Sequence, residues 1–238
     1  MTSDLYRPDR IRALFDEMAA TYGTVHLVSS FGLTSRWRKQ CLARAALRAG
    51  ATVVDLMSGM GELWPGIAKS IGSGGRIEAV DLSPVMCGRA RAMWTKRNDC
   101  PAHLFEGDIF EWDFPRAAAD AVVSTFGVKT FSPEQIERLA GVVYELLKPG
   151  GSFSFLEISI PRALWLRVPY ESYVKYVIPL IGRLFLGNPD NYRMLYVYTR
   201  AFGNCAGAAR AFADAGLEVR EYRCFLGCAT GISGRKPG

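Results

Sequence analysis

The chain has 238 residues, of which 49% are hydrophobic, 12% aromatic and 22% charged. This composition is typical of a packed globular domain and excludes a disordered tail protein, a collagen-like repeat and a disulfide-stapled miniprotein. Lys and Arg number 29 and Asp and Glu number 23, so the net charge is +6. This excess is spread along the chain, and it favours anionic partners without choosing among them.

Nothing in the sequence indicates targeting to or across a membrane. Residues 1–12 are polar and charged, unlike a signal peptide. The most apolar run, residues 176–187, is interrupted by Pro179 and Arg183 and is too short to cross a bilayer. We therefore expect a cytoplasmic protein with no transmembrane segment. Six cysteines without a Cys-x-x-Cys pair, together with only two histidines, predict reduced thiols and no metal site.

The N-terminal part of the chain predicts helices over about residues 9–49. Apolar residues recur at helical spacing within residues 9–20, and a second helix is expected over residues 35–49. Beyond residue 50 the pattern changes to an alternation of strands and helices. The predicted strands are 51–56, 76–81, 102–105, 119–125 and 151–158, and the helices between them are 62–71, 84–98 and 133–147. This alternation is typical of a parallel sheet covered by helices on both faces.

An aromatic-rich segment, residues 161–202, interrupts the alternation. We expect it to form helices inserted after the fifth strand as a cap. A helix over residues 206–215 and two strands, 217–223 and 225–233, then complete the sheet. The sequence thus predicts one α/β domain over residues 1–238 with a Rossmann-like sheet of seven strands.

Short acidic and glycine-containing motifs follow the first three predicted strands. The first strand runs into Asp55-Leu56-Met57-Ser58-Gly59-Met60-Gly61-Glu62, a Gly-x-Gly turn that lets backbone approach a ligand closely. The second strand ends in Asp81-Leu82, where a carboxylate is placed to accept from two ribose hydroxyls. The third is followed by Asp108-Ile109, where an acid is placed to accept from the amino group of adenine.

The ligand that best fits these motifs is a nucleoside without phosphates. The glycine pattern is not Gly-x-Gly-x-x-Gly, because Trp64 occupies the last position. Glu62 at the start of the following helix would also repel a pyrophosphate. A zwitterionic nucleoside fits better, and we expect S-adenosylmethionine (SAM).

The sequence resembles the class I SAM-dependent methyltransferases, and in particular the UbiE-type ubiquinone/menaquinone C-methyltransferases, over nearly its full length. The resembling segments are Phe15-Asp16 to Tyr22, Ser30-Phe31-Gly32-Leu33, Trp37-Arg38, Asp55 to Glu62, Leu146 to Gly151, Leu156-Glu157 and Asp190-Asn191-Tyr192-Arg193. The resemblance implies a seven-stranded sheet with SAM at the carboxyl ends of the strands, and a small-molecule substrate.

The resemblance also implies which residues hold SAM. The methionine end would lie against Asp55, Met57, Ser58, Gly59, Met60 and Gly61. Asp81 with Leu82 would hold the ribose, Asp108 and Ile109 the adenine, and Thr125 the floor of the site. Tyr22 would close over the amino-acid end. For Asp55, fixing the glycine loop is the alternative role, and for Tyr22 it is packing at a hinge.

The sequence departs from the family pattern in three segments. Met57 and Met60 replace a small residue and a threonine, and Tyr198 replaces a serine. Lys129-Thr130 stands where the family has Arg-Asn, a position linked to handling the quinol proton, so Lys129 is a candidate catalytic residue. These departures leave the methyl acceptor open.

Two reactions fit these residues. The first is methyl transfer to a separate small molecule, which needs in-line placement of the nucleophile. The alternative is cyclisation of SAM itself by an azetidine-2-carboxylate synthase, with release of methylthioadenosine. In either case an aromatic ring of the cap, for which we choose Tyr176, would stabilise the sulfonium by cation–π contact. Nucleic acid is an unlikely substrate, since Ser124-Thr125-Phe126-Gly127 replaces the Pro-Pro motif of many nucleic-acid methylases. The remaining hypothesis for the function is a non-catalytic SAM-binding module.

Overall fold

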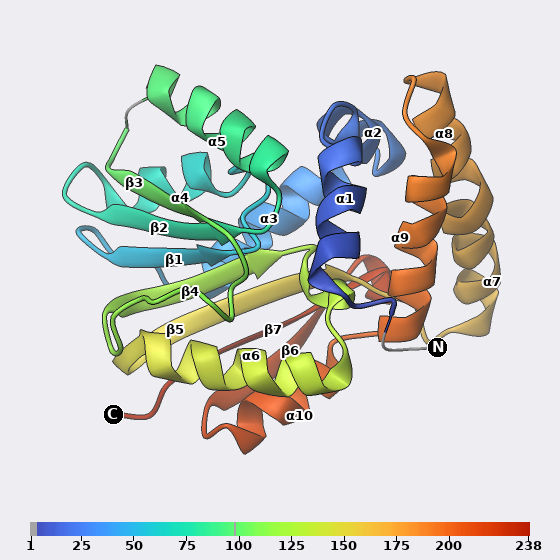
Figure 1. Cartoon of the computed structure of the whole chain (residues 1–238). Coiled ribbons are helices and arrows are strands. Elements are labelled where there is room, and N and C mark those ends of the chain that lie inside the picture. Colours follow the sequence, from blue (N-terminus) through green and yellow to red (C-terminus); the bar gives the residue numbers. More distant parts are fainter. Residues whose placement is uncertain (1–3, 98) are drawn as a thin grey trace.

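The computed structural model describes residues 4–97 and 99–238. Its centre is a seven-stranded sheet in the order β3-β2-β1-β4-β5-β7-β6 (Figure 1). The strands are β1 Thr52–Leu56, β2 Arg76–Asp81, β3 Ala102–Glu106, β4 Ala119–Thr125, β5 Leu147–Ile158, β6 Glu218–Cys224 and β7 Ala229–Arg235. The first five are parallel, and β7 runs antiparallel between β5 and β6. The predicted α/β class and the seven-stranded sheet are confirmed.

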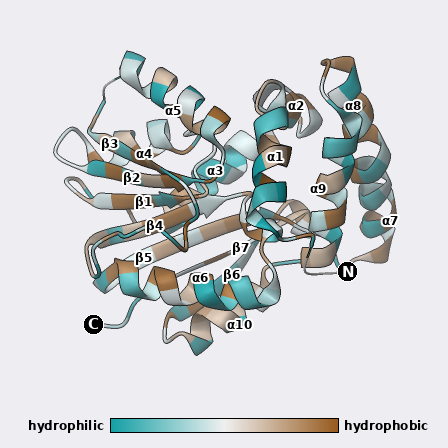
Figure 2. Ribbon diagram, viewed as in Figure 1, coloured by the Kyte–Doolittle hydropathy of each residue, from teal (hydrophilic) through white to brown (hydrophobic). Residues whose placement is uncertain are grey.

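Helices cover both faces of this sheet (Figure 1). The helices are α1 Pro8–Met18, α2 Tyr22–Ser29, α3 Leu33–Arg44, α4 Trp64–Ile71, α5 Pro84–Arg97, α6 Pro133–Leu146, α7 Leu164–Ser172, α8 Ile178–Leu184, α9 Pro189–Phe202 and α10 Ala206–Asp214. In β1, Val53 faces the cluster that contains α4 residues, and Val54 faces the cluster that contains α6 residues. Both faces of the central strands are therefore buried, which explains why β1 and β4 are mostly apolar along their length (Figure 2).

Sequence signals fix the start of two helices. Ser132 caps α6 in a capping box with Gln135, and Pro133 occupies the first turn. Ser83 caps α5 by accepting from the backbone N–H of Met86. The predicted end of α5, Asn98, lies outside the described residues.

The N-terminal helices differ from the prediction. An additional helix, α2, lies between α1 and α3, and α3 ends at Arg44 instead of continuing to residue 49. The left-handed backbone of Ala46, with φ of 48°, stops α3 there. The α2 segment was missed because its apolar residues show little amphipathic periodicity.

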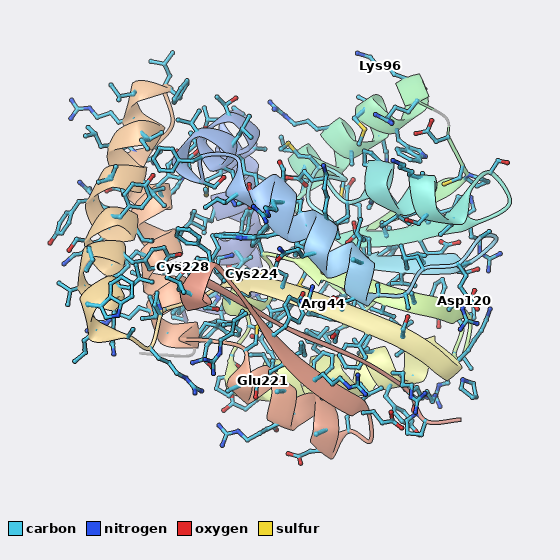
Figure 3. The ribbon with its side chains drawn as sticks, turned by 180° about the vertical axis from the view of Figure 1, so that it is seen from behind. Arg44, Lys96, Asp120, Glu221, Cys224 and Cys228 are labelled. Carbon is cyan, nitrogen blue, oxygen red and sulfur yellow. The ribbon has the colours of Figure 1, made fainter. Side chains whose placement is uncertain are left out.

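The last strand also begins later than predicted. Phe225, Leu226 and Gly227 all have positive φ and form a turn, so β7 starts at Ala229. Cys224 and Cys228 flank this turn near the base of α7 (Figure 3).

The predicted cap is helical. It consists of α7, a π-helical turn at Tyr173–Val177, α8 and α9, and it packs beside α1 and α2 at one end of the sheet (Figure 1). No helix in the described part of the chain is long and apolar enough to span a bilayer. The carboxyl ends of the parallel strands therefore face the N-terminal helices and the cap.

We predict that Phe153→Ala lowers the free energy of unfolding by about 3–5 kcal/mol, because a fully buried ring is removed from its contacts with Phe155 and Phe212. Denaturant unfolding measures this change. Glu137→Ala on the exposed face of α6 is the matched control, with an expected change within about 0.5 kcal/mol. Equal stability of the two variants would show that this cluster does not hold the sheet together.

Candidate active site

A cavity opens at the carboxyl ends of β1, β2 and β4, with about 940 Å³ of space free of protein atoms when its mouth is included. It lies where the strand order reverses between β1 and β4, the position at which open α/β sheets bind ligands. Residues of α1, α2 and α3 close it from the other side, among them Ile11, Tyr22 and Arg38. We call it the first cavity.

Most of the residues predicted to hold SAM line this cavity. They are Tyr22, Asp55, Met57, Ser58, Gly59, Asp81, Leu82, Asp108, Ile109 and Thr125. Met60 and Gly61 are not part of the lining. Gly61 instead shapes the turn, because its φ is 77° and a Cβ there would come within 2.9 Å of the Trp64 ring.

Asp81 connects the two loops that follow β1 and β2. Its Oδ2 accepts from the backbone N–H of Gly59 at 2.7 Å, and its Oδ1 accepts from that of Ser83 at 2.9 Å. Burial raises the pKa of Asp81 to about 6, and the negative charges of Glu62 and Asp16 add to this rise. Each carboxylate oxygen has a further lone pair for a donor inside the cavity.

Asp55 brings a second carboxyl to the first cavity, and only 1% of it is exposed. Its Oδ2 accepts from Trp64 Nε1 at 3.1 Å, so it anchors the start of α4 as well as lining the site. Burial, and then the charge of Glu62, hold the pKa of Asp55 well above its usual value. A cation entering the cavity would stabilise the ionised form.

Arg38 and Glu62 form a partly buried ion pair in the same cavity, with 3.3 Å between Arg38 Nη2 and Glu62 Oε1. Sequence reasoning assigned neither residue to the site. The available signals were the Trp37-Arg38 segment of the family resemblance and the acid that follows the glycine turn. Arg38 Nε and Ser58 Oγ are buried without a hydrogen-bond partner in the described structure. A polar ligand would satisfy both atoms, since buried polar groups are almost always paired.

Two non-glycine residues at the site have strained backbone. Met57, directly after β1, has φ of 54°, and Phe126, directly after β4, has φ of 66°. A Cβ on Gly127 would come within 2.7 Å of Met57 Cβ, so the two loops are in close contact. Contact between these two loops therefore holds the strained backbone of Met57 and Phe126 in place at the floor of the cavity.

A second cavity adjoins the first, with about 1120 Å³ of space free of protein atoms when its open mouth is included. Tyr22 and Phe126 line both cavities, and thus form the boundary between them. Its other walls are mostly apolar and aromatic and come from α2, α3, the end of β5, α7, the π-helical turn, α8 and α9. They include Val25, Trp37, Ile158, Tyr170, Tyr173, Val174, Ile178, Tyr192 and Leu195.

His26 on α2 is a polar group of the second cavity that sequence reasoning missed. Its ring packs against Tyr22 at 5.1 Å and edge-on against Phe126 at 5.0 Å between centroids. Arg38 Nη2 lies 3.4 Å from Nδ1, and an arginine can only donate, so the neutral ring carries its proton on Nε2. Burial, and then the charges of Arg38 and Lys129, hold the pKa of His26 well below its usual value. His26 is thus a neutral donor.

Lys129 also lines the second cavity, but most of its bonding capacity is used within the protein. Its Nζ donates to the Phe126 carbonyl and lies 3.0 Å from Glu157 Oε1, and both side chains are almost completely buried. The backbone N–H of Lys129 donates to Glu157 Oε2. The pair ties the turn after β4 to the end of β5.

The structure does not bring Tyr176 to either cavity. Its side chain is 62% exposed on the outer side of the π-helical turn, with the ammonium of Lys175 5.0 Å from its ring centroid. Tyr170 and Tyr173 do line the second cavity, and their hydroxyls donate to backbone carbonyls. The geometry gives no support to a role of Tyr176 at a sulfonium, because the cap turns this residue outwards.

Comparisons with known proteins agree with this fold. The model of the ubiE/COQ5 methyltransferase family matches residues 4–234. A demethylmenaquinone methyltransferase of Thermus thermophilus is 30% identical, covering 94% of this chain and all of the relative, and one of Listeria monocytogenes is 27% identical, covering 94% of each. The structure of Haemonchus contortus phosphoethanolamine N-methyltransferase 2 with S-adenosylhomocysteine superposes with a TM-score of 0.61 at 13% identity. That match covers 85% of this chain and about half (53%) of the other.

The fold and the site define a SAM-dependent methyltransferase with the class I sheet. More narrowly, the chain belongs to the ubiE/COQ5 methyltransferase family. Its cofactor is SAM, as predicted, and it is a transferase. None of the comparisons favours the alternative of an azetidine-2-carboxylate synthase.

We predict that SAM affinity is constant above neutral pH and falls as the pH drops through about 6, by up to tenfold per unit, because protonated Asp81 accepts poorly from ribose hydroxyls. Asp81→Asn should weaken SAM binding by about 1.5–3 kcal/mol and flatten this dependence. Calorimetry across the pH range measures both. If the variant kept the full pH dependence, another carboxyl, such as Asp55, would be responsible.

Proposed function

We propose that this methyltransferase holds SAM in the first cavity and transfers its methyl group to a ring carbon of a quinone-type small molecule held in the second. The observation that carries the proposal is the aromatic-walled cavity that meets the first one at Tyr22 and Phe126. Such a cavity suits a flat apolar ring with few polar groups. The names of the relatives, demethylmenaquinone methyltransferases, support the same substrate class.

Within this proposal the first cavity holds SAM as the family resemblance implies. Asp81 and Leu82 take the ribose, Asp108 and Ile109 the adenine, and Thr125 forms the floor. The methionine end lies among Asp55, Met57, Ser58, Gly59 and Tyr22, with Met60 and Gly61 shaping the turn from behind. The two unpaired atoms fit this placement, since Arg38 Nε suits the ligand carboxylate and Ser58 Oγ a further polar group. The buried carboxyl of Asp55 suits a cationic amino group.

The residues of the second cavity favour a ring hydroxyl in its ionised form. When bound, SAM would supply an electrophilic methyl group, and the new bond to the ring carbon would form as the bond from methyl to sulfur breaks. The ring carbon is nucleophilic once the neighbouring hydroxyl has lost its proton to solvent, and after methylation this carbon releases its own hydrogen to solvent as a proton. The positive charges of Lys129 in this cavity and of Arg38, which lines the first cavity next to His26, lower the pKa of such a hydroxyl. The neutral His26 adds an Nε2–H donor for the developing oxyanion.

Lys129 is, in this proposal, a positioning residue more than a proton carrier. Its pairing with Glu157 and with the Phe126 carbonyl fixes the aromatic ring between the two cavities. Its charge acts on the acceptor without a proton being moved. Tyr176 has no part in the proposed reaction, because it lies outside both cavities.

One departure from the family pattern does not touch the acceptor. Tyr198 is fully buried, and its hydroxyl donates to the Leu5 carbonyl at 2.8 Å, so it packs α9 against the N-terminal segment.

We further propose that residues 1–238 act as one domain in which the cap, residues 161–202, covers the acceptor cavity. Residues of α7 and α9 in that cavity support this role. A cytoplasmic location remains a prediction.

The first test is incubation with SAM and a reduced demethylated naphthoquinone that carries a short isoprenoid tail. We expect one methyl group added to the ring for each S-adenosylhomocysteine formed, as measured by mass spectrometry. The matched control is the same quinone already methylated at that carbon, which should leave SAM unchanged. Formation of methylthioadenosine from SAM alone, without a methylated product, would contradict the proposal.

The second test separates a donor at His26 from packing. His26→Leu should lower kcat about 10²-fold with little change in SAM affinity, because a preorganised donor to the oxyanion is lost. His26→Gln retains an N–H close to the Nε2 position and should recover most of the activity. Activity equally low in both variants would assign His26 to packing against Tyr22 and Phe126.

A further inference from the structure

The outermost part of the cap is one continuous rod. α7, the π-helical turn and α8 follow one another without a break from Leu164 to Leu184, and the residues at both junctions have right-handed helical backbone. Twenty-one residues of helix are about 30 Å long. We call this segment the cap rod.

The cap rod has two apolar faces. Its inner face carries Tyr170, Tyr173, Val174 and Ile178, which line the second cavity. Its outer side carries large apolar residues that recur mostly at intervals of four and are more than half exposed, namely Leu164, Trp165, Val168, Tyr176, Leu180 and Leu184. A helix that buries one face and exposes large apolar residues along the other is typical of a helix with a second partner.

The charges on the segment around the rod are almost all positive. Residues 161–187 contain Arg162, Arg167, Lys175 and Arg183 against one acid, Glu171, which pairs with Arg167 at 2.8 Å. All four basic residues are exposed. Two copies of this surface would repel each other, whereas an anionic lipid surface would attract it.

The apolar surface continues to the mouth of the second cavity. Phe31 is 83% exposed, packs against Tyr173 with 6.4 Å between ring centroids, and also lines that cavity. Phe225, 57% exposed, lines it as well. These are strongly exposed members of the lining, so the cavity opens beside the rod.

We propose that the cap rod binds the surface of an anionic bilayer, with its outer apolar residues in the headgroup–acyl boundary and its Lys and Arg side chains at the phosphates. Amphipathic helices rich in basic residues bind membranes in this manner, and long basic side chains reach the headgroups while their stems cover apolar surface. The mouth of the second cavity then faces the lipid, and an acceptor with an apolar tail reaches the cavity without crossing water. The membrane contact itself does not depend on which acceptor is used.

The test is co-flotation of the full-length protein with vesicles, without SAM or acceptor. Vesicles of phosphatidylcholine mixed with phosphatidylglycerol should bind the protein at least tenfold more strongly than vesicles of phosphatidylcholine alone. Leu180→Asp combined with Leu184→Asp should lower binding at least tenfold. Lys175→Ser combined with Arg183→Ser should remove most of the preference for the anionic vesicles.

The matched control is Phe105→Asp, which removes an exposed apolar ring on β3 at the far edge of the sheet and should leave vesicle binding unchanged. Melting temperature checks that each variant is folded, and methylation of a short-tailed acceptor in detergent-free buffer should be retained by the rod variants. Equal binding by the wild type and the rod variants would overturn the proposal. So would a dimer in light scattering that the Leu180 and Leu184 substitutions dissociate, because it would assign the rod to a second copy of the chain.

Discussion

The arrangement of both cavities depends on the buried ion pair between Lys129 and Glu157. Glu157 lies in β5 and Lys129 in the turn after β4, so the pair closes the carboxyl ends of two neighbouring strands. The Lys129 ammonium also holds the carbonyl of Phe126, whose backbone is strained. Removing one partner of such a pair leaves a buried charge and costs about 3–5 kcal/mol. The bonds of Lys129 to Glu157 and to the Phe126 carbonyl therefore keep the strained backbone of Phe126 in place.

Charges of opposite sign are separated across the boundary that Phe126 forms. Asp55, Asp81 and Glu62 face the first cavity. Burial raises the pKa of Asp55 and Asp81, and a cationic ligand would favour their ionised forms. Lys129 and the neutral ring of His26 face the second. Arg38 lies between them, since it pairs with Glu62 and approaches His26. One side of the boundary thus suits a sulfonium and the other a developing oxyanion.

The cap has an inner side that lines the second cavity and an outer side that is exposed to the surroundings of the protein. The helices α7 and α9 complete the aromatic wall that the sheet lacks, and Tyr170 ties the cap to the end of the sheet through the Cys228 carbonyl. The outer face of the cap rod does not contribute to this wall. Its apolar residues stay exposed together with the basic side chains. Such a surface is typical of a contact with a partner outside the chain.

The sequence by itself determined the sheet and the cofactor. Apolar strands that alternate with helices predict a parallel sheet, and Asp55, Asp81 and Asp108 lie at or just after the ends of strands. Their position at one edge of the sheet follows from parallel pairing alone. Because their positions are local in sequence or set by strand order, nine predicted residues at the strand ends and in the loops after them line the first cavity.

Only the tertiary structure decided the residues of the second cavity. His26 and Arg38 are far from Phe126 in sequence, yet both side chains pack against its ring. Glu157 of β5 reaches the same residue through Lys129, which donates to the Phe126 carbonyl. Tyr176 shares the cap with Tyr173, but its place in the π-helical turn directs it to solvent, since that turn shifts the helical register. Which aromatic residue reaches a cavity depends on packing between distant elements, and periodicity within one segment does not contain that information.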